Sequence, residues 1–303
     1  ATLAELAEEG APVVAVDADL TGSTTTKKFA AAAPENADKL FNCGIAEQNM
    51  IDVAAGLALT GHVAYTGSFA VFGTGRAYDQ IRNTVCYSNL DVKICPTHAG
   101  VSVGPDGGSH QMLEDVSLMR GLPNMRVLVP ADYAAARAAI KLAAKTPGPV
   151  YVRMGRAAVP CVYDDDVELE LGRAYVLREG SDATVVACGV EIREALAAAD
   201  MLAEEGVSIE VIDAFSVKPL DEDTITASVA KTGCCVVAEE HSVHGGLGSA
   251  VAECLARKNP APCEFVGVQD RFGKSGEFEE LLGYFNLDAA AIVEAVKRAR
   301  GRK

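Results

Sequence analysis

Short runs of apolar, largely β-branched residues alternate with helical stretches along the whole chain. In the first half these runs are 12–18, 63–68, 92–98, 126–130 and 149–153. Each is bounded by Gly, Pro or Asp, and each is hydrophobic throughout rather than at every second residue. Strands of a parallel sheet are buried on both faces and have this composition. The first half is therefore expected to form a parallel sheet covered by helices.

The same alternation resumes in the second half of the chain. Four further apolar runs are bounded in the same way, at 183–188, 208–212, 235–239 and 263–268. Apolar spacing and punctuation by Gly, Pro and Asp predict helices between the runs. The helices expected in the whole chain are 1–10, 51–59, 75–88, 131–144, 191–205, 221–230, 248–257 and 288–300.

An acidic segment, Tyr-Asp-Asp-Asp-Val-Glu-Leu-Glu at 163–170, separates the two halves and has no helical period. We predict an α/β protein with two doubly wound parallel-type sheets, in a first domain 1–160 and a second domain 181–303 joined by a linker 161–180. In such sheets ligands bind outside the carboxyl ends of the strands. The loops that follow the strands of the first half are therefore the expected location of a site.

Charge and cysteine content narrow the class of protein. With 42 acidic against 27 basic residues the net charge is −15, which argues against a nucleic-acid partner. No segment is typical of a membrane span or a secretory signal, although the chain starts at Ala1 rather than Met, which favours residues upstream. Nine cysteines without a Cys-x-x-Cys pair favour reduced thiols in a cytoplasmic protein and no metal site of its own.

Glu47 is an isolated carboxylate at the entry to the apolar, small-residue helix 51–59. Such a group is either exposed at the helix start or buried for a chemical reason. A partly desolvated glutamate has a raised pKa and can hold a proton.

Three loops at predicted strand ends carry unusual residues, at 17–23, 65–72 and 97–110. The third is rich in glycine and contains two of the five histidines, His98 and His110. We expect His98 to end a strand and His110 to open the next helix; the alternative is a hydrogen-bonded turn without a chemical role. Phe69 and Phe72 in the second loop are suited to wall a flat ring, although ordinary core packing would also explain them.

Four segments in this order and spacing together resemble the transketolase family of thiamine diphosphate enzymes. They are Gly-Ile-Ala-Glu-Gln-Asn-Met at 44–50, His98 with Asp106-Gly-Gly-Ser-His-Gln at 106–111, Leu-Pro-Asn-Met with Pro-Ala-Asp at 122–132, and Ser-Val-Lys-Pro-Leu at 216–220. The resemblance covers nearly the whole chain. It implies a thiamine pyrimidine-binding domain followed by a transketolase C-terminal domain.

The resemblance also implies roles toward the cofactor. Glu47 matches the catalytic glutamate that shares a proton with the aminopyrimidine ring and so helps to activate thiamine diphosphate. Phe69 and Phe72 match the aromatic pocket around that ring, and Asp19 falls near the centre of the cofactor. The carbon chemistry would belong to the cofactor, while the protein tunes its electronics.

Further residues are implied toward the sugar phosphate. His98, a second catalytic residue, matches a histidine near the reacting carbonyl, and Asp106 matches the aspartate that contacts a sugar hydroxyl. His110 and Ser23 match residues nearer the sugar chain and its phosphate. Arg156 aligns with the phosphate-binding arginine, with Arg153 as a second candidate, because a guanidinium suits bidentate phosphate contact.

Two departures from the family pattern change the interpretation. Gly75 stands where the family has a third aromatic residue of the pocket. The Gly-Asp-Gly…Asn signature that holds the diphosphate and its metal has no match. The chain therefore looks like the C-terminal subunit of a split transketolase. It is expected to need an N-terminal subunit that holds Mg²⁺ or Ca²⁺, to self-associate within a heterotetramer, and to use its second half mainly for dimer support.

The expected reaction is transfer of a two-carbon ketol unit from a ketose phosphate to an aldose phosphate, in the pentose phosphate pathway or on a less usual ketose. A deoxyxylulose phosphate synthase is one alternative, but it has Asp-Arg where this chain has Thr97-His98. The β subunit of a 2-oxo acid dehydrogenase is another, and it generally lacks the equivalent of His110. A non-catalytic paralogue would not need to retain Glu47, His98, Asp106 and His110 together.

Overall fold

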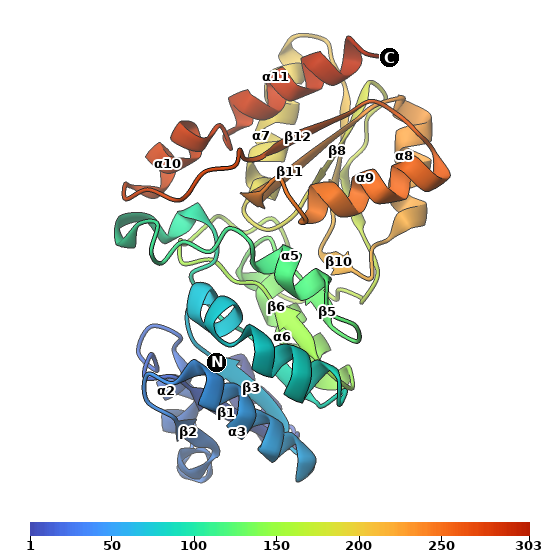
Figure 1. Cartoon of the computed structure of the whole chain (residues 1–303). Coiled ribbons are helices and arrows are strands. Elements are labelled where there is room, and N and C mark those ends of the chain that lie inside the picture. Colours follow the sequence, from blue (N-terminus) through green and yellow to red (C-terminus); the bar gives the residue numbers. More distant parts are fainter.

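The computed structural model describes all 303 residues. The chain forms two α/β halves, each built on its own sheet, and Figure 1 shows one above the other. The first half, blue to green, provides six strands of a seven-stranded sheet in the order β10-β5-β6-β4-β3-β1-β2, and the seventh, β10, comes from the second half of the chain. All its pairs are parallel except β10 with β5. Its strands are β1 Val13–Asp17, β2 Leu40–Asn42, β3 Val63–Gly67, β4 Val92–Ile94, β5 Arg126–Leu128, β6 Val150–Val152 and β10 Ser216–Lys218.

The second half, yellow to red, holds a five-stranded sheet in the order β12-β11-β8-β9-β7. Here β7 alone runs antiparallel to its neighbour, β9. The prediction of two parallel-type α/β sheets is confirmed. The strands of this sheet are β7 Tyr175–Arg178, β8 Ala183–Ala187, β9 Ile209–Asp213, β11 Cys235–Ser242 and β12 Cys263–Val268.

None of the helices combines the length and the apolar composition that crossing a bilayer requires.

Helices cover both sheets, and short η segments mark 3₁₀- and π-helical turns. The first half contains α1 Thr2–Glu8, α2 Thr26–Ala32, η1 Pro34–Lys39, α3 Glu47–Leu59, η2 Val71–Arg76, α4 Tyr78–Gln80, η3 Ile81–Cys86, η4 Val101–Asp106, α5 Asp115–Arg120 and α6 Tyr133–Lys145. The second half contains α7 Glu191–Glu204, α8 Glu222–Thr232, α9 Leu247–Lys258, α10 Phe278–Phe285 and α11 Ala289–Arg300.

The first sheet is buried on both faces, which explains its unbroken apolar strands. Along β1, Val14 and Val16 pack in one core with α3, while Val13 and Ala15 pack in another with α6. Asp132 caps α6 by accepting a hydrogen bond from the backbone N–H of Ala135 at 2.8 Å, so the helix begins at Tyr133, two residues after the predicted start.

The two halves share a hydrophobic core rather than touching at a polar surface. The core cluster that contains α3 continues into β8, β9, α8 and α9 of the second half, through residues such as Val186, Ile212 and Leu255. Strand β10 also crosses from the second half to pair with β5 at the edge of the first sheet. These contacts fix the second half relative to the strand ends of the first.

Several local expectations were wrong. The run 92–98 forms a strand only as far as Ile94, because the chain then turns through two isolated bridges, one of them to Phe69. The segment 161–180, expected as a linker, contains the edge strand β7. Two strands gave no signal in the sequence, β2 and β10. Each is an edge strand of only three residues that include polar ones, which is too short for a recognisable apolar run, although Ser216 and Val217 of β10 are buried.

Buried carboxyl groups at the carboxyl ends of the second sheet give a testable property. Burial raises the pKa of Glu240 to about 7 despite Arg153, and burial raises that of Asp213 to about 7 although the Tyr163 hydroxyl donates to it at 2.8 Å. Their ordinary values are 4.5 and 3.8. Between those values and pH 7 the unfolded chain releases protons that the folded chain keeps, so stability falls as pH rises.

We expect the melting temperature to decrease from pH 5 to pH 7.5, with each group contributing at most about 1.4 kcal/mol per pH unit. Glu240→Gln should flatten this dependence, as measured by thermal unfolding across the pH range. The surface substitution Glu204→Gln on α7 is the control and should leave the slope of the parent chain. An unchanged slope in Glu240→Gln would contradict the assignment.

Candidate active site

The loops that follow β1, β3, β4 and β6 meet at one edge of the first sheet, because these strands are parallel neighbours. Phe69 pairs through its backbone with Thr97, which joins the loop after β3 to the loop after β4. Most of the residues predicted for the site lie on these loops. The start of α3 brings in Glu47.

Glu47 is the first residue of α3, and its side chain is only 2% exposed. Its Oε2 accepts a hydrogen bond from Nη1 of Arg76 at 2.8 Å, while Oε1 has no hydrogen-bond partner within the chain. The sequence left open whether the Glu47 carboxylate is exposed or buried, and the structure shows that it is buried. Arg76 was not predicted; the only indication in the sequence is its position four residues after Phe72.

Four aromatic rings form a cluster beside this ion pair. The ring of Phe69 stacks on that of His98 with centroids 3.9 Å apart, and on that of Phe72 at 6.3 Å. His110 meets the edge of Phe72 at 5.4 Å. The guanidinium of Arg76 lies 4.4 Å from the Phe72 centroid and so connects the cluster to Glu47. The structure thus brings together the carboxylate, both phenylalanines and both histidines.

His98 is held in an unusual conformation, with φ at +64° and a side chain only 8% exposed. Its Nδ1 lies 2.8 Å from the Thr97 hydroxyl. Burial lowers the pKa of His98 to about 4, and the positive charge of Arg156 adds to that effect. At neutral pH the ring is therefore an uncharged imidazole that can donate one hydrogen bond and accept another.

His110 does not open a helix as expected. It lies in a turn in which its N–H donates to the carbonyl of Gly107, and α5 begins only at Asp115. Gly107 has φ at +75°, and the tight turn at this glycine prevents a helix from starting there. Asp106 ends η4 with an exposed side chain, and its charge acts on His98.

Ser23 lies on the exposed loop after β1 and lines a cavity of about 230 Å³ together with Thr97 and Gly67. This loop is shaped by Asp17, a buried residue that the sequence analysis did not select. Its carboxylate accepts hydrogen bonds from the Thr24 hydroxyl at 2.7 Å and the Thr26 hydroxyl at 2.8 Å. Ser23 is therefore brought, through a shared cavity, close to the loop 97–110 that carries His98 and His110, which we call the histidine loop.

Asp19 follows the same strand but takes part in a different contact. Its side chain is exposed and accepts a hydrogen bond from Nδ2 of Asn42 at 3.3 Å. No hydrogen bond or ion pair connects Asp19 to the aromatic cluster. The structure by itself places Asp19 in the loop between β1 and β2, where its only side-chain hydrogen bond is the one with Asn42.

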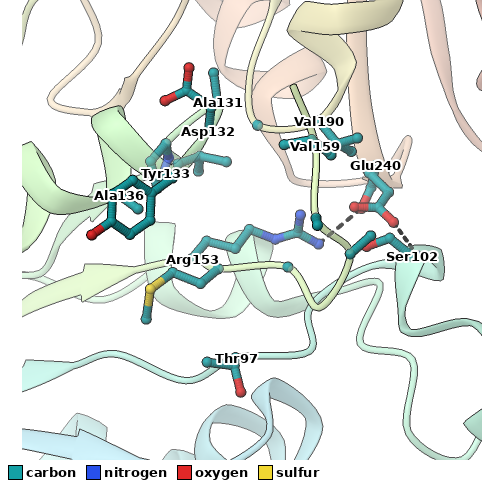
Figure 2. A pocket seen from close by; sticks show the side chains of 17 residues that line it. Thr97, Ser102, Ala131, Asp132, Tyr133, Ala136, Arg153, Val159, Val190 and Glu240 are labelled. Atoms are coloured by element: carbon teal, nitrogen blue, oxygen red, sulfur yellow. Dashed lines mark hydrogen bonds between the residues drawn. The ribbon is translucent and has the colours of Figure 1, made fainter. Parts of the chain in front are cut away.

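The two candidate arginines differ in accessibility. Arg156 is exposed, and its Nη1 donates to the carbonyl of Val103 at 2.6 Å beside the histidine loop. Arg153 is buried, with Nε bonded to the Asp115 carboxylate at 2.7 Å and Nη2 bonded to the carbonyl of Glu240 at 2.9 Å. Figure 2 shows its guanidinium reaching across a cavity of about 370 Å³ toward Glu240. The geometry favours Arg156 for an external phosphate.

The second half of the chain also contacts the histidine loop, and its expected role in dimer support stays a prediction. The Glu240 carboxylate accepts a hydrogen bond from the backbone N–H of Ser102 (Figure 2). The Gln111 side-chain amide donates a hydrogen bond to the backbone carbonyl of Lys274 and accepts one from the backbone N–H of the same residue. The motif that ends in His110-Gln111 was recognised in the sequence, but a tertiary partner 163 residues away could not be.

Gly75 directly precedes Arg76, whose guanidinium lies over the Phe72 ring. It is exposed, and the nearest atom to a Cβ placed on it would be the terminal methyl of Met112 at 3.7 Å. A larger side chain at this position would therefore contact the end of the Met112 side chain.

Comparisons with known proteins agree with this architecture. The model of the transketolase pyrimidine-binding domain matches residues 1–162, and that of the transketolase C-terminal domain matches residues 172–292. A putative transketolase C-terminal section from Methanocaldococcus jannaschii is 45% identical over 97% of this chain and 92% of its own length. A 6-deoxy-6-sulfo-D-fructose transketolase subunit from a Clostridium species is 42% identical over 99% of this chain and 92% of its own length.

The fold is also similar to that of a solved structure. A split-gene transketolase, described as an inactive β4 tetramer, superposes with a TM-score of 0.90 at 48% identity. The match covers 100% of this chain and 96% of that one.

The neutral state of His98 can be tested by NMR. With ¹⁵N-labelled histidine, the ring nitrogens of His98 should keep the shifts of a neutral imidazole from pH 5.5 to pH 8, because its pKa is about 4. Arg156→Gln should raise that pKa by removing a nearby positive charge, while burial keeps it below the ordinary value of 6.5. Assignment by His98→Gln identifies the resonance, and a titration of His98 near pH 6.5 in the parent chain would contradict the prediction.

Proposed function

The chain belongs to the transketolase family, and from that premise we propose that it is the C-terminal subunit of a two-chain transketolase. Together with an N-terminal subunit it transfers a two-carbon ketol unit from a ketose phosphate to an aldose phosphate. The observation that carries this proposal is the buried Glu47 carboxylate beside the stacked rings of Phe69 and His98.

The transketolase family implies thiamine diphosphate, and the residues present fit its aminopyrimidine ring. Glu47 offers Oε1, an acceptor oxygen without a partner in the chain, inside a site that excludes most water. Phe69 and Phe72 offer apolar ring surface next to it. When bound, thiamine diphosphate supplies the carbon nucleophile of the reaction. Glu47 would orient the pyrimidine and hold a proton on its ring nitrogen, and the phenylalanines would exclude water.

The histidine loop is suited to the sugar. A neutral His98 can donate a hydrogen bond to a carbonyl or hydroxyl oxygen without placing a positive charge in the site. Asp106 is free to accept from a sugar hydroxyl, and the exposed Arg156 can pair with a phosphate. His110 and Ser23 complete the proposed lining. Asp19 is assigned to the cofactor side on the family pattern alone.

A separate partner is supported by the nature of the relatives. One is a C-terminal section and another a named subunit, and the structural neighbour is an inactive tetramer of β chains. Ile45, two residues before Glu47, is 77% exposed, as expected of an apolar side chain that a second chain covers. We assign the diphosphate and its Mg²⁺ or Ca²⁺ to the N-terminal subunit, in a cytoplasmic heterotetramer.

The ketose itself is the least constrained part of this proposal. The Clostridium relative is a sulfofructose transketolase subunit, so split subunits are not restricted to the sugars of the pentose phosphate pathway. Arg156 would recognise the terminal anionic group rather than the carbon skeleton. A coupled assay with a panel of ketose phosphates and sulfonates would order the substrates.

The chain alone should show no ketol transfer and only weak binding of thiamine diphosphate, because half of the cofactor site is missing. Adding the N-terminal subunit with Mg²⁺ should restore transfer from a ketose phosphate to an aldose phosphate, measured in a coupled spectrophotometric assay. Robust activity of the purified single chain would refute the two-chain proposal.

Replacement of the proposed proton-sharing carboxylate provides a second test. Glu47→Gln should lower kcat of the reconstituted enzyme by about 10²-fold or more, because an amide cannot hold the proton, while assembly is retained. The control is Asp52→Asn, which neutralises an exposed carboxylate on the same helix and should leave kcat unchanged. Normal turnover by Glu47→Gln, with assembly verified by size-exclusion chromatography, would remove Glu47 from the mechanism.

A further inference from the structure

A segment of the second half lies directly on the histidine loop. We define this segment, residues 270–276, as the C-terminal strap; it connects β12 to α10. Figure 1 shows α10 and the chain leading to it beside the loop that precedes α5. Strap and loop are therefore close in space although more than 160 residues separate them in sequence.

Gln111 connects the two segments through its side-chain amide, which is only 4% exposed. Its Nε2 donates to the carbonyl of Lys274 at 2.9 Å and to that of Val101 at 3.1 Å. Its Oε1 accepts from the backbone N–H of Lys274 at 2.7 Å. The Gln111 amide thus both donates to and accepts from the strap. It also donates to Val101, the first residue of η4, the segment that ends at Asp106.

The two backbones approach too closely for additional side-chain atoms. A Cβ on Gly108 would lie 2.8 Å from the carbonyl oxygen of Gly273, and a Cβ on Gly273 would overlap Oε1 of Gln111. A Cβ on Gly107 would overlap the Ser275 hydroxyl. The glycines at these positions permit the contact.

The strap is itself held by α10. The Lys274 ammonium lies 4.1 Å from the centroid of Tyr284, and the Arg271 guanidinium lies 4.7 Å from that of Phe285. Phe285 is buried in the core of the second half. The histidine loop is therefore attached, through Gln111 and the strap, to a rigid part of the second half.

We propose that Gln111 is a positioning residue that holds the histidine loop, and with it His98 and Asp106, in place against the C-terminal strap. The effect of Gln111 on catalysis rests on the proposed function. The attachment of the histidine loop to the strap does not. The amide is required because the site needs both a donor and an acceptor. A carboxylate would face two carbonyl oxygens and lose both of these bonds, and buried polar groups left unpaired are costly.

Hydrogen exchange on the full chain tests the coupling without any assay of activity. Gln111→Glu should accelerate exchange about tenfold or more in amides of 98–110 and at Lys274, and leave β8 and β11 unchanged. Gly273→Ala should give the same pattern from the opposite side, because its methyl group displaces the Gln111 amide. The control is Gln269→Glu, an exposed glutamine of the same region that bonds only the carbonyl of Gly267.

The proposal is overturned if both variants leave exchange in 98–110 unchanged, or if exchange rises equally in the core strands. In the reconstituted enzyme, Gln111→Glu and Gly273→Ala should lower kcat/KM for the sugar phosphate at least tenfold, with unchanged affinity for thiamine diphosphate. Unchanged kcat/KM in both would refute the catalytic consequence. Absence of ketol transfer in the parent complex would instead refute the proposed function, and the exchange result would still decide the coupling.

Discussion

The buried ion pair between Arg153 and Asp115 is the interaction on which the arrangement of the two halves depends. Burial alone would raise the pKa of Asp115, but the Arg153 guanidinium holds it below its ordinary value. Asp115 also accepts from the Tyr151 hydroxyl at 2.5 Å, and Arg153 donates to the carbonyl of Glu240 on β11. The pair therefore joins β6, α5 and the second sheet at one point. Removing one partner of such a pair costs about 3–5 kcal/mol, because the other charge is left buried.

Much of the fold follows from the pattern of apolar runs. Strands such as β1, β8 and β9 are buried at every residue, so their burial is visible in the sequence itself. The edge strands β2 and β7 are partly exposed, and β10 is largely buried but only three residues long, so none of them has a comparable pattern. The pairing of β10 with the first sheet is a contact between distant parts of the chain, and local sequence contains no information about it.

The parts of the candidate site whose location follows from the sheet topology alone could be predicted from the sequence. Parallel strands place their carboxyl ends at one edge, so the loops with Phe69 and His98 had to lie near each other. The buried position of Arg153 could not be predicted, because an arginine at a strand end has the same appearance whether it faces solvent or a buried Asp115. Arg76 and Gln111 were missed because each acts through a tertiary partner. A glutamine suggests a surface position, and only the fold shows that Gln111 is buried. Arg76 does lie at the surface, and only the fold shows that it pairs with the buried Glu47.

The network around the histidine loop also bears on where a transketolase can be divided into two chains. The loop is bonded to the second half at Ser102 through Glu240 and at Gln111 through Lys274, both by buried groups. A break between these halves would expose the core that they share and leave those polar groups unpaired. Glu47, in contrast, keeps Oε1 without a partner in the chain and has the exposed Ile45 near it, so this face is open to the partner proposed above. The shared core and the buried hydrogen bonds therefore hold the first and second halves of this chain together, whereas no comparable contact covers the face with Glu47 and Ile45.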